Sequence, residues 1–153
     1  MKKLFALILT VSLLASMSVT AFAANTAGGK ADITTSIAPT YTVTIPADVN
    51  VAFNATETDF GTIEVTASQI HPDKCIKVAL TTDGELNNAI DNTKVIPYEI
   101  QDSEGNAFTS ATYLTEGDKT ELSIHITTND WNAAYAGDYS DTVTFTVSYE
   151  DKA

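Results

Sequence analysis

The sequence predicts an all-β domain, an antiparallel sandwich of about seven to nine short strands. Apolar residues alternate with threonine and other polar residues in several segments, which is the period of a half-buried strand. Glycine, proline, asparagine and aspartate interrupt these segments at short intervals, as turns require. No segment after the first 23 residues shows the period of a helix. The three observations together favour strands joined by turns.

Residues 1–23 have the three parts of a secretory signal peptide. Met1–Lys3 is positively charged, residues 4–14 are mostly apolar, and Ala21-Phe22-Ala23 is a small-x-small cleavage site. Cleavage there leaves 130 of the 153 residues, enough for one domain. No later stretch approaches the about 20 apolar residues of a membrane span, so we expect a secreted protein without a transmembrane anchor.

Residues 24–38 are expected to form a flexible arm that carries a weak strand. The first part is small, polar and contains glycine, whereas Ile33 and Ile37 share one face of the segment 31–37. The folded domain is expected to span residues 39–153. Its first strand lies between Pro39 and Pro46, because proline cannot donate a hydrogen bond within a central ladder.

The rest of the domain alternates between expected strands and polar connections. The last strand has the cleanest pattern, because Val143, Phe145 and Val147 alternate with threonines and are expected to face the core. Polar connections are expected at 54–59, 83–92 and 102–106. The expected strands are 49–53, 60–66, 75–81, 96–100, 108–114, 120–127 and 142–149.

Composition excludes one class of partner. All basic residues are lysines, and loss of the signal peptide leaves six of them against 20 acidic residues, a formal net charge of −14. Nucleic-acid binding depends on clustered basic side chains, so we expect none. The single cysteine, Cys75, has no partner for an intramolecular disulfide and is expected to be a small buried residue.

No catalytic or metal-binding pattern is present. The two histidines, His71 and His125, lie near no nucleophile motif and form no ligand pair at short spacing, so we expect no enzyme, no cofactor and no metal site. Residues 102–106 offer oxygen ligands at alternate positions, as a calcium loop does. That segment lacks the glycine and the distal glutamate of a calcium loop, which favours an ordinary hairpin turn.

The loop 129–139 holds the only tryptophan, Trp131, together with Tyr135 and Tyr139. Such rings, flanked by asparagine and aspartate, could stack on a sugar. The favoured alternative is that Trp131 closes one end of the sandwich, since small domains use large aromatic side chains in their cores.

Gly137–Asp141, which contains Tyr139, resembles the tyrosine corner of immunoglobulin-like sandwiches, where a tyrosine near the start of strand F bonds to upstream backbone. In those folds a further strand follows. Here the sequence ends soon after the strand that Tyr139 introduces, so the resemblance implies an immunoglobulin-like sandwich that is one strand short.

Residues 136–149 also resemble the closing segment of spore-coat-protein-U-like and related fimbrial subunits. The resemblance implies a sandwich completed by a neighbour's N-terminal strand, although the chain lacks that family's paired cysteines. Pro39–Pro46 is similar to an opening strand that recurs in uncharacterised exported proteins of Gram-positive bacteria, which implies no function.

The leading hypothesis is a secreted bacterial cell-surface subunit, structural or adhesive, that polymerises when a neighbour's Ile33 and Ile37 add a strand beside residues 143–149. Its partners would be other copies of itself or other surface proteins. The alternative is a monomeric extracellular module that binds a ligand such as a glycan through Trp131 and Tyr135.

Overall fold

A computed structural model describes residues 8–9 and 32–152. Most of the expected signal peptide and the first part of the expected arm lie outside these residues. The described part of the chain is all-β, with one short helix, and all its strand pairs are antiparallel.

The largest sheet has five strands in the order β1-β2-β3-β9-β7. Its strands are β1 (Ile8–Leu9), β2 (Thr40–Thr44), β3 (Glu57–Gln69), β9 (Lys119–His125) and β7 (Glu99–Asp102). Two three-stranded sheets complete the fold, with the orders β11-β4-β8 and β10-β5-β6. Their strands are β11 (Thr144–Asp151), β4 (Lys74–Thr81), β8 (Ser110–Tyr113), β10 (Tyr139–Ser140), β5 (Glu85–Asn88) and β6 (Val95–Pro97).

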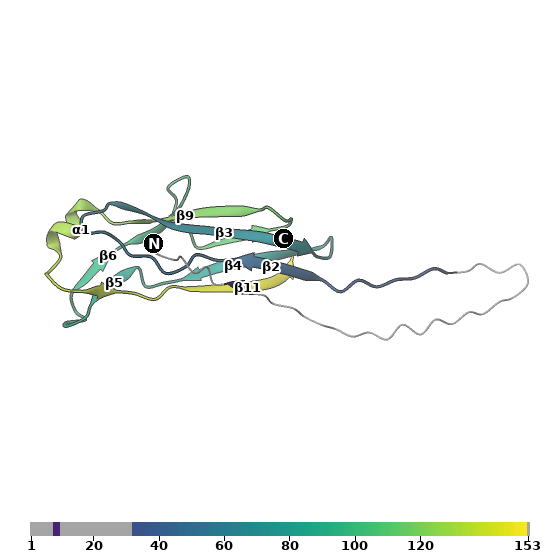
Figure 1. Cartoon of the computed structure of the whole chain (residues 1–153), viewed down its shortest axis with the longest axis horizontal. Coiled ribbons are helices and arrows are strands. Elements are labelled where there is room, and N and C mark those ends of the chain that lie inside the picture. Colours follow the sequence, from purple (N-terminus) through teal and green to yellow (C-terminus); the bar gives the residue numbers. More distant parts are fainter. Residues whose placement is uncertain (1–7, 10–31, 153) are drawn as a thin grey trace, which may run out of the picture.

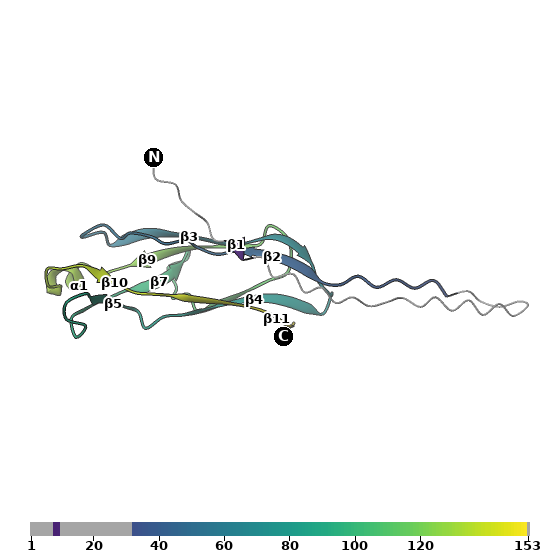
Figure 2. The same cartoon turned by 60° about the horizontal axis from the view of Figure 1, so that its bottom comes forward.

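The sheets form two layers. In Figure 2, β2, β3 and β9 lie in one layer and β4, β5 and β11 in the other. Between the layers, alternate side chains of facing strands make one apolar core. Its fully buried residues include Ile63 and Val65 from β3 and Ile76 and Val78 from β4.

A β-bulge in β3 lets both Phe60 and Ile63 face the core. The register with β9 shifts between Asp59 and Gly61, so that Phe60 and Ile63 are both buried although they lie an odd number of residues apart. Gly61 has φ +112°, a conformation that favours glycine.

Several predicted strands are confirmed. Those predicted around 40–45, 60–66, 75–81 and 120–127 correspond to β2, β3, β4 and β9. Residues 142–149 largely correspond to β11, although pairing begins at Thr144, and 108–114 shortens to β8.

One predicted strand is wrong, and the strand predicted in the arm stays a prediction. Residues 49–53 form no strand, and Phe53 is 79% exposed, because no neighbouring strand pairs with them. The described part of the arm strand, residues 32–37, is also unpaired within the described chain.

Three further predictions need correction. The connection 83–92 contains β5, which pairs with β6 and β10. The predicted strand 96–100 divides at Tyr98, so that β6 and β7 belong to different layers. The loop 129–139 begins with the helix α1 (Thr128–Ala133), capped where Asp130 N–H donates to Thr127 Oγ1 at 3.2 Å.

Candidate functional site

The two lateral flanks of the fold are built differently. On the closed flank, which comprises β7, β8 and residues 103–109 between them, the chain passes from one layer to the other. Phe108 is buried there, and its N–H donates to Ile100 O at 2.8 Å. This crossing covers the core, and its backbone N–H and C=O groups take part in hydrogen bonds such as this one.

The open flank lies opposite and comprises β2, β11 and the segments 45–53 and 137–143. At one end the rings of Tyr41 and Tyr149 stack with their centroids 5.8 Å apart. Beyond this contact a groove of about 670 Å³ separates the two layers, between residues 45–53 on one side and 137–145 on the other.

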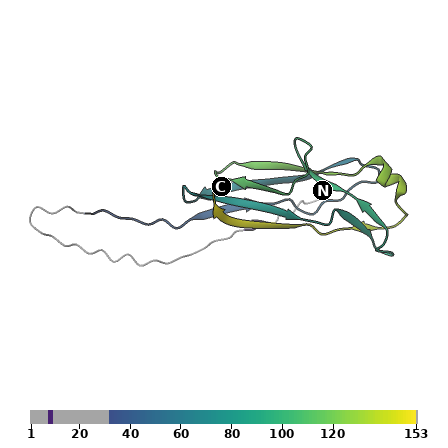
Figure 3. The same ribbon diagram turned by 180° about the vertical axis from the view of Figure 1, so that it is seen from behind.

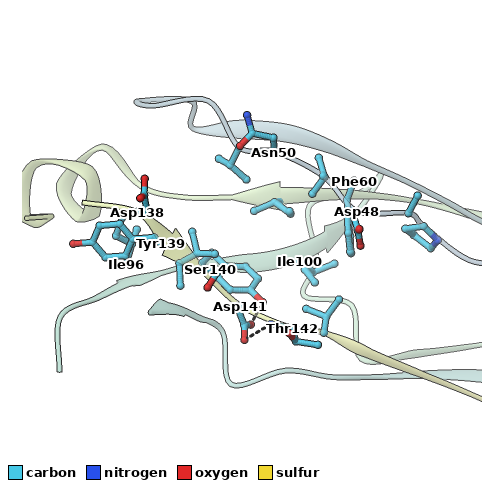
Figure 4. Close-up of a pocket in the computed structure, with 18 of the residues that line it drawn as sticks. Asp48, Asn50, Phe60, Ile96, Ile100, Asp138, Tyr139, Ser140, Asp141 and Thr142 are labelled. Carbon is cyan, nitrogen blue, oxygen red and sulfur yellow. Dashed lines mark hydrogen bonds between the residues drawn. The ribbon is translucent and has the colours of Figure 1, made fainter. Parts of the chain in front are cut away.

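The floor of the groove is apolar. It is formed by core residues that come from several strands and from both layers, including Phe60, Ile96, Ile100, Ile124 and Phe145. The rings of Phe60 and Phe145 lie 6.0 Å apart across it. Figure 4 shows Phe60, Ile96 and Ile100 between the two walls. The groove therefore borders the hydrophobic core, in which Phe60, Ile96, Ile100 and Ile124 are buried and Phe145 is partly exposed.

The rim of the groove is polar and acidic. Asp48 and Asn50 lie on one wall, and Asp138, Ser140 and Asp141 lie on the other (Figure 4). None of the three carboxylates takes part in an ion pair with a described lysine.

Hydrogen bonds hold the wall 137–143 in place. Tyr98 O–H donates to Asp141 Oδ2 at 2.5 Å, and Thr82 Oγ1 lies 3.1 Å from the same oxygen. Burial, and then the bond to this carboxylate, raise the pKa of Tyr98 well above its usual range. Tyr98 therefore fixes the segment between β10, which pairs with β5, and β11, which pairs with β4.

Tyr139 fixes the same wall further along. Its hydroxyl donates to Tyr135 O at 3.0 Å and accepts from Tyr135 N at 3.2 Å, and its ring packs against the core. A local bond to upstream backbone is what the tyrosine-corner resemblance implies. Nearby, a side chain on Gly137 would meet Asn88 Nδ2 at 2.6 Å, so this position needs glycine.

The three apolar residues of β11 belong to this flank. Val143, Phe145 and Val147 pack against the core, as the alternation predicts, yet each is only half-buried. β11 pairs with β4 along one edge, and no described residue pairs with its other edge.

The structure does not bring Trp131 and Tyr135 into one site. Trp131 lines the groove, half-buried, with its indole N–H donating to Ala55 O at 2.8 Å and the Phe53 ring edge-on at 5.6 Å. Tyr135 does not line the groove, and Lys94 Nζ lies 5.0 Å from its ring centroid.

The arm buries little surface in the part of the chain that the structure describes, although Thr35, Ile37 and Ala38 line a small pocket with residues 69–72. Residues 32–38 are all exposed, with Ile33 98% and Ile37 61% exposed. Figures 1 and 3 show this segment leaving β2 and extending away from both layers. Two apolar side chains on one face are thus left for another surface.

Other candidate residues form no site. Among residues 8–9 and 32–152, no group of three or more metal-ligating side chains comes together. The Asp102 carboxylate accepts the N–H groups of Glu104 and Asn106, which are bonds within a turn. No described helix has the length and apolar character needed to cross a membrane.

Comparison with models of known protein families finds no match, and comparison with curated proteins finds none either. The candidate site therefore rests on its geometry. Sequence reasoning missed the groove walls, since the alternation in 49–53 shows apolar residues but not that they border a gap between layers.

Proposed function

We propose that the protein is a secreted cell-surface subunit, structural or adhesive, that assembles when the arm of one copy adds a strand to the open flank of another. In this proposal the fold is an immunoglobulin-like sandwich with one position left for a neighbour. The observation that carries the proposal is the apolar groove beside a strand edge, β11, that no described residue pairs.

Unpaired backbone groups and the partly exposed apolar side chains of β11 both favour an added strand. An open edge presents N–H and C=O groups that need partners, and proteins normally cover such edges. A strand along β11 would also bury more of Val143, Phe145 and Val147, which the fold alone leaves half-exposed. Strand addition supplies both kinds of contact.

The arm has the properties of that strand. Ile33 and Ile37 lie on one face of an extended segment, so both can enter an apolar groove while Thr34 and Ser36 face out. The seven residues 32–38 span about 23 Å when extended, comparable to the eight residues of β11.

Export from the cell, which the proposal requires, is supported by the signal-peptide pattern of residues 1–23. The large negative charge favours solubility and limits nonspecific association, so contacts between copies would depend on a specific strand rather than on adhesive patches.

The test compares the assembly of mature protein, residues 24–153, with that of two variants by sedimentation velocity over a range of concentrations. We expect oligomers for the mature protein and monomers both for the deletion of 24–38 and for the double variant Ile33→Asp/Ile37→Asp. Ile90→Asp is the control, because Ile90 is 90% exposed but does not line the groove, and this variant should assemble normally. A mature protein that stays monomeric at high concentration would exclude the proposal.

A second candidate function is a monomeric module that binds a glycan in the same groove. It is favoured by Trp131 and the polar side chains Asp48 and Asn50, which all line the groove. Its test is the fluorescence of Trp131 during titration with a panel of oligosaccharides. A saturable change with one glycan, in a protein that does not oligomerise, would support this function over assembly.

A further inference from the structure

We infer that the incoming arm lies antiparallel to β2 and parallel to β11, with its positively charged N-terminal end over the acidic half of the open flank. The inference rests on the proposed function and specifies how the partner binds. It depends on four observations: the directions of β2 and β11, the pairing of β1 with β2, the distribution of charge along the open flank, and the position of Pro39.

The two strands that border the open flank run in opposite directions. Tyr41, near the start of β2, stacks on Tyr149, near the end of β11. From this contact the groove extends along residues 45–53, which follow β2 in the chain, and along residues 137–145, which precede most of β11. The arrows of β2 and β11 in Figure 1 agree. A strand between them is therefore antiparallel to one and parallel to the other.

The outer edge of β2 already carries a strand in the antiparallel orientation. Ile8 pairs with Thr44 and Leu9 with Val43. Both residues belong to the expected signal peptide, so its cleavage would remove them and leave this edge open. This edge of β2 thus accepts an antiparallel strand.

Charge distinguishes the two ends of the flank. At the Tyr149 end, Lys74 pairs with Asp151, and Lys77 Nζ lies 3.6 Å from Glu150 Oε2. At the groove end, Asp48, Asp138 and Asp141 have no such partner among the described lysines. The free negative charge is thus concentrated at the groove end.

The arm carries its positive charge at its N-terminal end. Lys30 precedes the two isoleucines, and cleavage after Ala23 would add an α-amino group at Ala24; Asp32, which also precedes the isoleucines, offsets one of these two charges and leaves a net charge of +1. Attraction to the groove end therefore favours the same polarity that β1 adopts on β2.

A second copy, rather than the arm's own domain, supplies this strand. To lie antiparallel to β2, the arm of the same chain would have to turn back at Ala38 and Pro39. Two-residue hairpin turns require positive φ at the first central residue, which disfavours Ala38, and type I′ turns require it also at the second, which Pro39 cannot adopt because its φ is held near −65°. The described arm instead continues away from β2 (Figure 1).

Disulfide trapping tests the polarity. In a Cys75→Ser background, one protein carries Lys30→Cys with Asp138→Cys, and its matched control carries Lys30→Cys with Glu150→Cys. We expect mild oxidation to give covalent multimers of the first protein and not of the second, while sedimentation reports assembly of both before oxidation. Multimers of the control alone, or assembly without cross-linking of either protein, would overturn the polarity but leave strand exchange standing. If neither protein assembles before oxidation and the Cys75→Ser parent does not assemble either, the proposed function fails as well.

Charge reversal provides a readout without cysteines. Lys30→Glu should weaken assembly by about two- to five-fold at low salt, an effect of the size expected for one exposed ion pair. Adding Asp138→Lys should restore assembly, and adding Glu150→Lys should not. Rescue by Glu150→Lys alone would contradict the inferred orientation.

Discussion

The closed and open flanks of this protein are made from similar strands but differ in how the chain connects the layers. On the closed flank, the crossing from β7 to β8 buries Phe108 and bonds its N–H to Ile100. On the open flank, no described segment crosses between β2 and β11, and Phe145 is only partly buried beside a groove. Burial of an apolar strand face thus depends on a covering segment as well as on alternation.

The largest expected effect is on the free energy of unfolding, when Phe108 of the closed flank and Phe145 of the open flank are each replaced by alanine. Phe108→Ala should lower the free energy of unfolding by about 3–5 kcal/mol, because this side chain is fully packed. Phe145→Ala should cost the dilute, monomeric protein less, about 2–3 kcal/mol, since its side chain is only partly buried. Denaturant unfolding measures both, and equal losses would mean that the open flank is packed as well as the closed one.

Removal of the hydrogen bond between Tyr98 and Asp141 tests whether this bond holds the groove wall 137–143 in place. Tyr98→Phe should cost about 1.5–3 kcal/mol, as expected for a lost hydrogen bond to a charged group. The pKa of Tyr98 is raised in the fold, so its contribution is complete below the ordinary value of 10.0 and is lost as pH rises through the folded-state pKa. Above pH 10 the melting temperature should therefore fall less steeply with rising pH in the variant than in the parent protein.

The stacked pair Tyr41 and Tyr149 is a direct contact between the border strands of the open flank. A double-mutant cycle with Tyr41→Leu and Tyr149→Leu should give a coupling of about 0.5–1.5 kcal/mol, the range for aromatic pairs. A coupling near zero would indicate that the two edges are independent and that the groove extends along the whole flank.

The smallest expected effect concerns Asp118, in the turn from β8 to β9. The N–H groups of Leu114 and Thr115 donate to its carboxylate and lower its pKa below the usual 3.8. The resulting stability is present above pH 3.8 and is lost as pH falls through the lowered value. Asp118→Asn should leave the open flank unchanged and reduce only the acid dependence of melting, which differential scanning calorimetry at pH 2–5 can detect. An unchanged acid dependence would contradict the assignment.

Local pattern predicted a large part of the fold. The strands β2, β3, β4, β9 and β11 were predictable because each alternates apolar and polar residues, and two-faced burial follows from that alternation. α1 was missed although a signal existed, since Thr127 and Asp130 have the spacing of a helix N-cap.

The candidate site was only partly predictable. Ile33, Ile37 and the faces of Val143, Phe145 and Val147 could be named from the sequence, because exposure or burial of a strand face is a local property. The groove could not, because its walls 45–53 and 137–143 come from opposite ends of the domain. Whether Trp131 would border it depended on a contact with Ala55, 76 residues away.

The sequence by itself determined the strand-forming segments, the acidic charge and the apolar arm, because side-chain type and spacing fix these properties within a few residues. Only the tertiary structure decided that Tyr98 divides one alternating segment between two layers, and that one flank is crossed by the chain while the other is left open. These outcomes depend on which edges meet in space, and alternation gives the same local signal for a paired edge and an unpaired one.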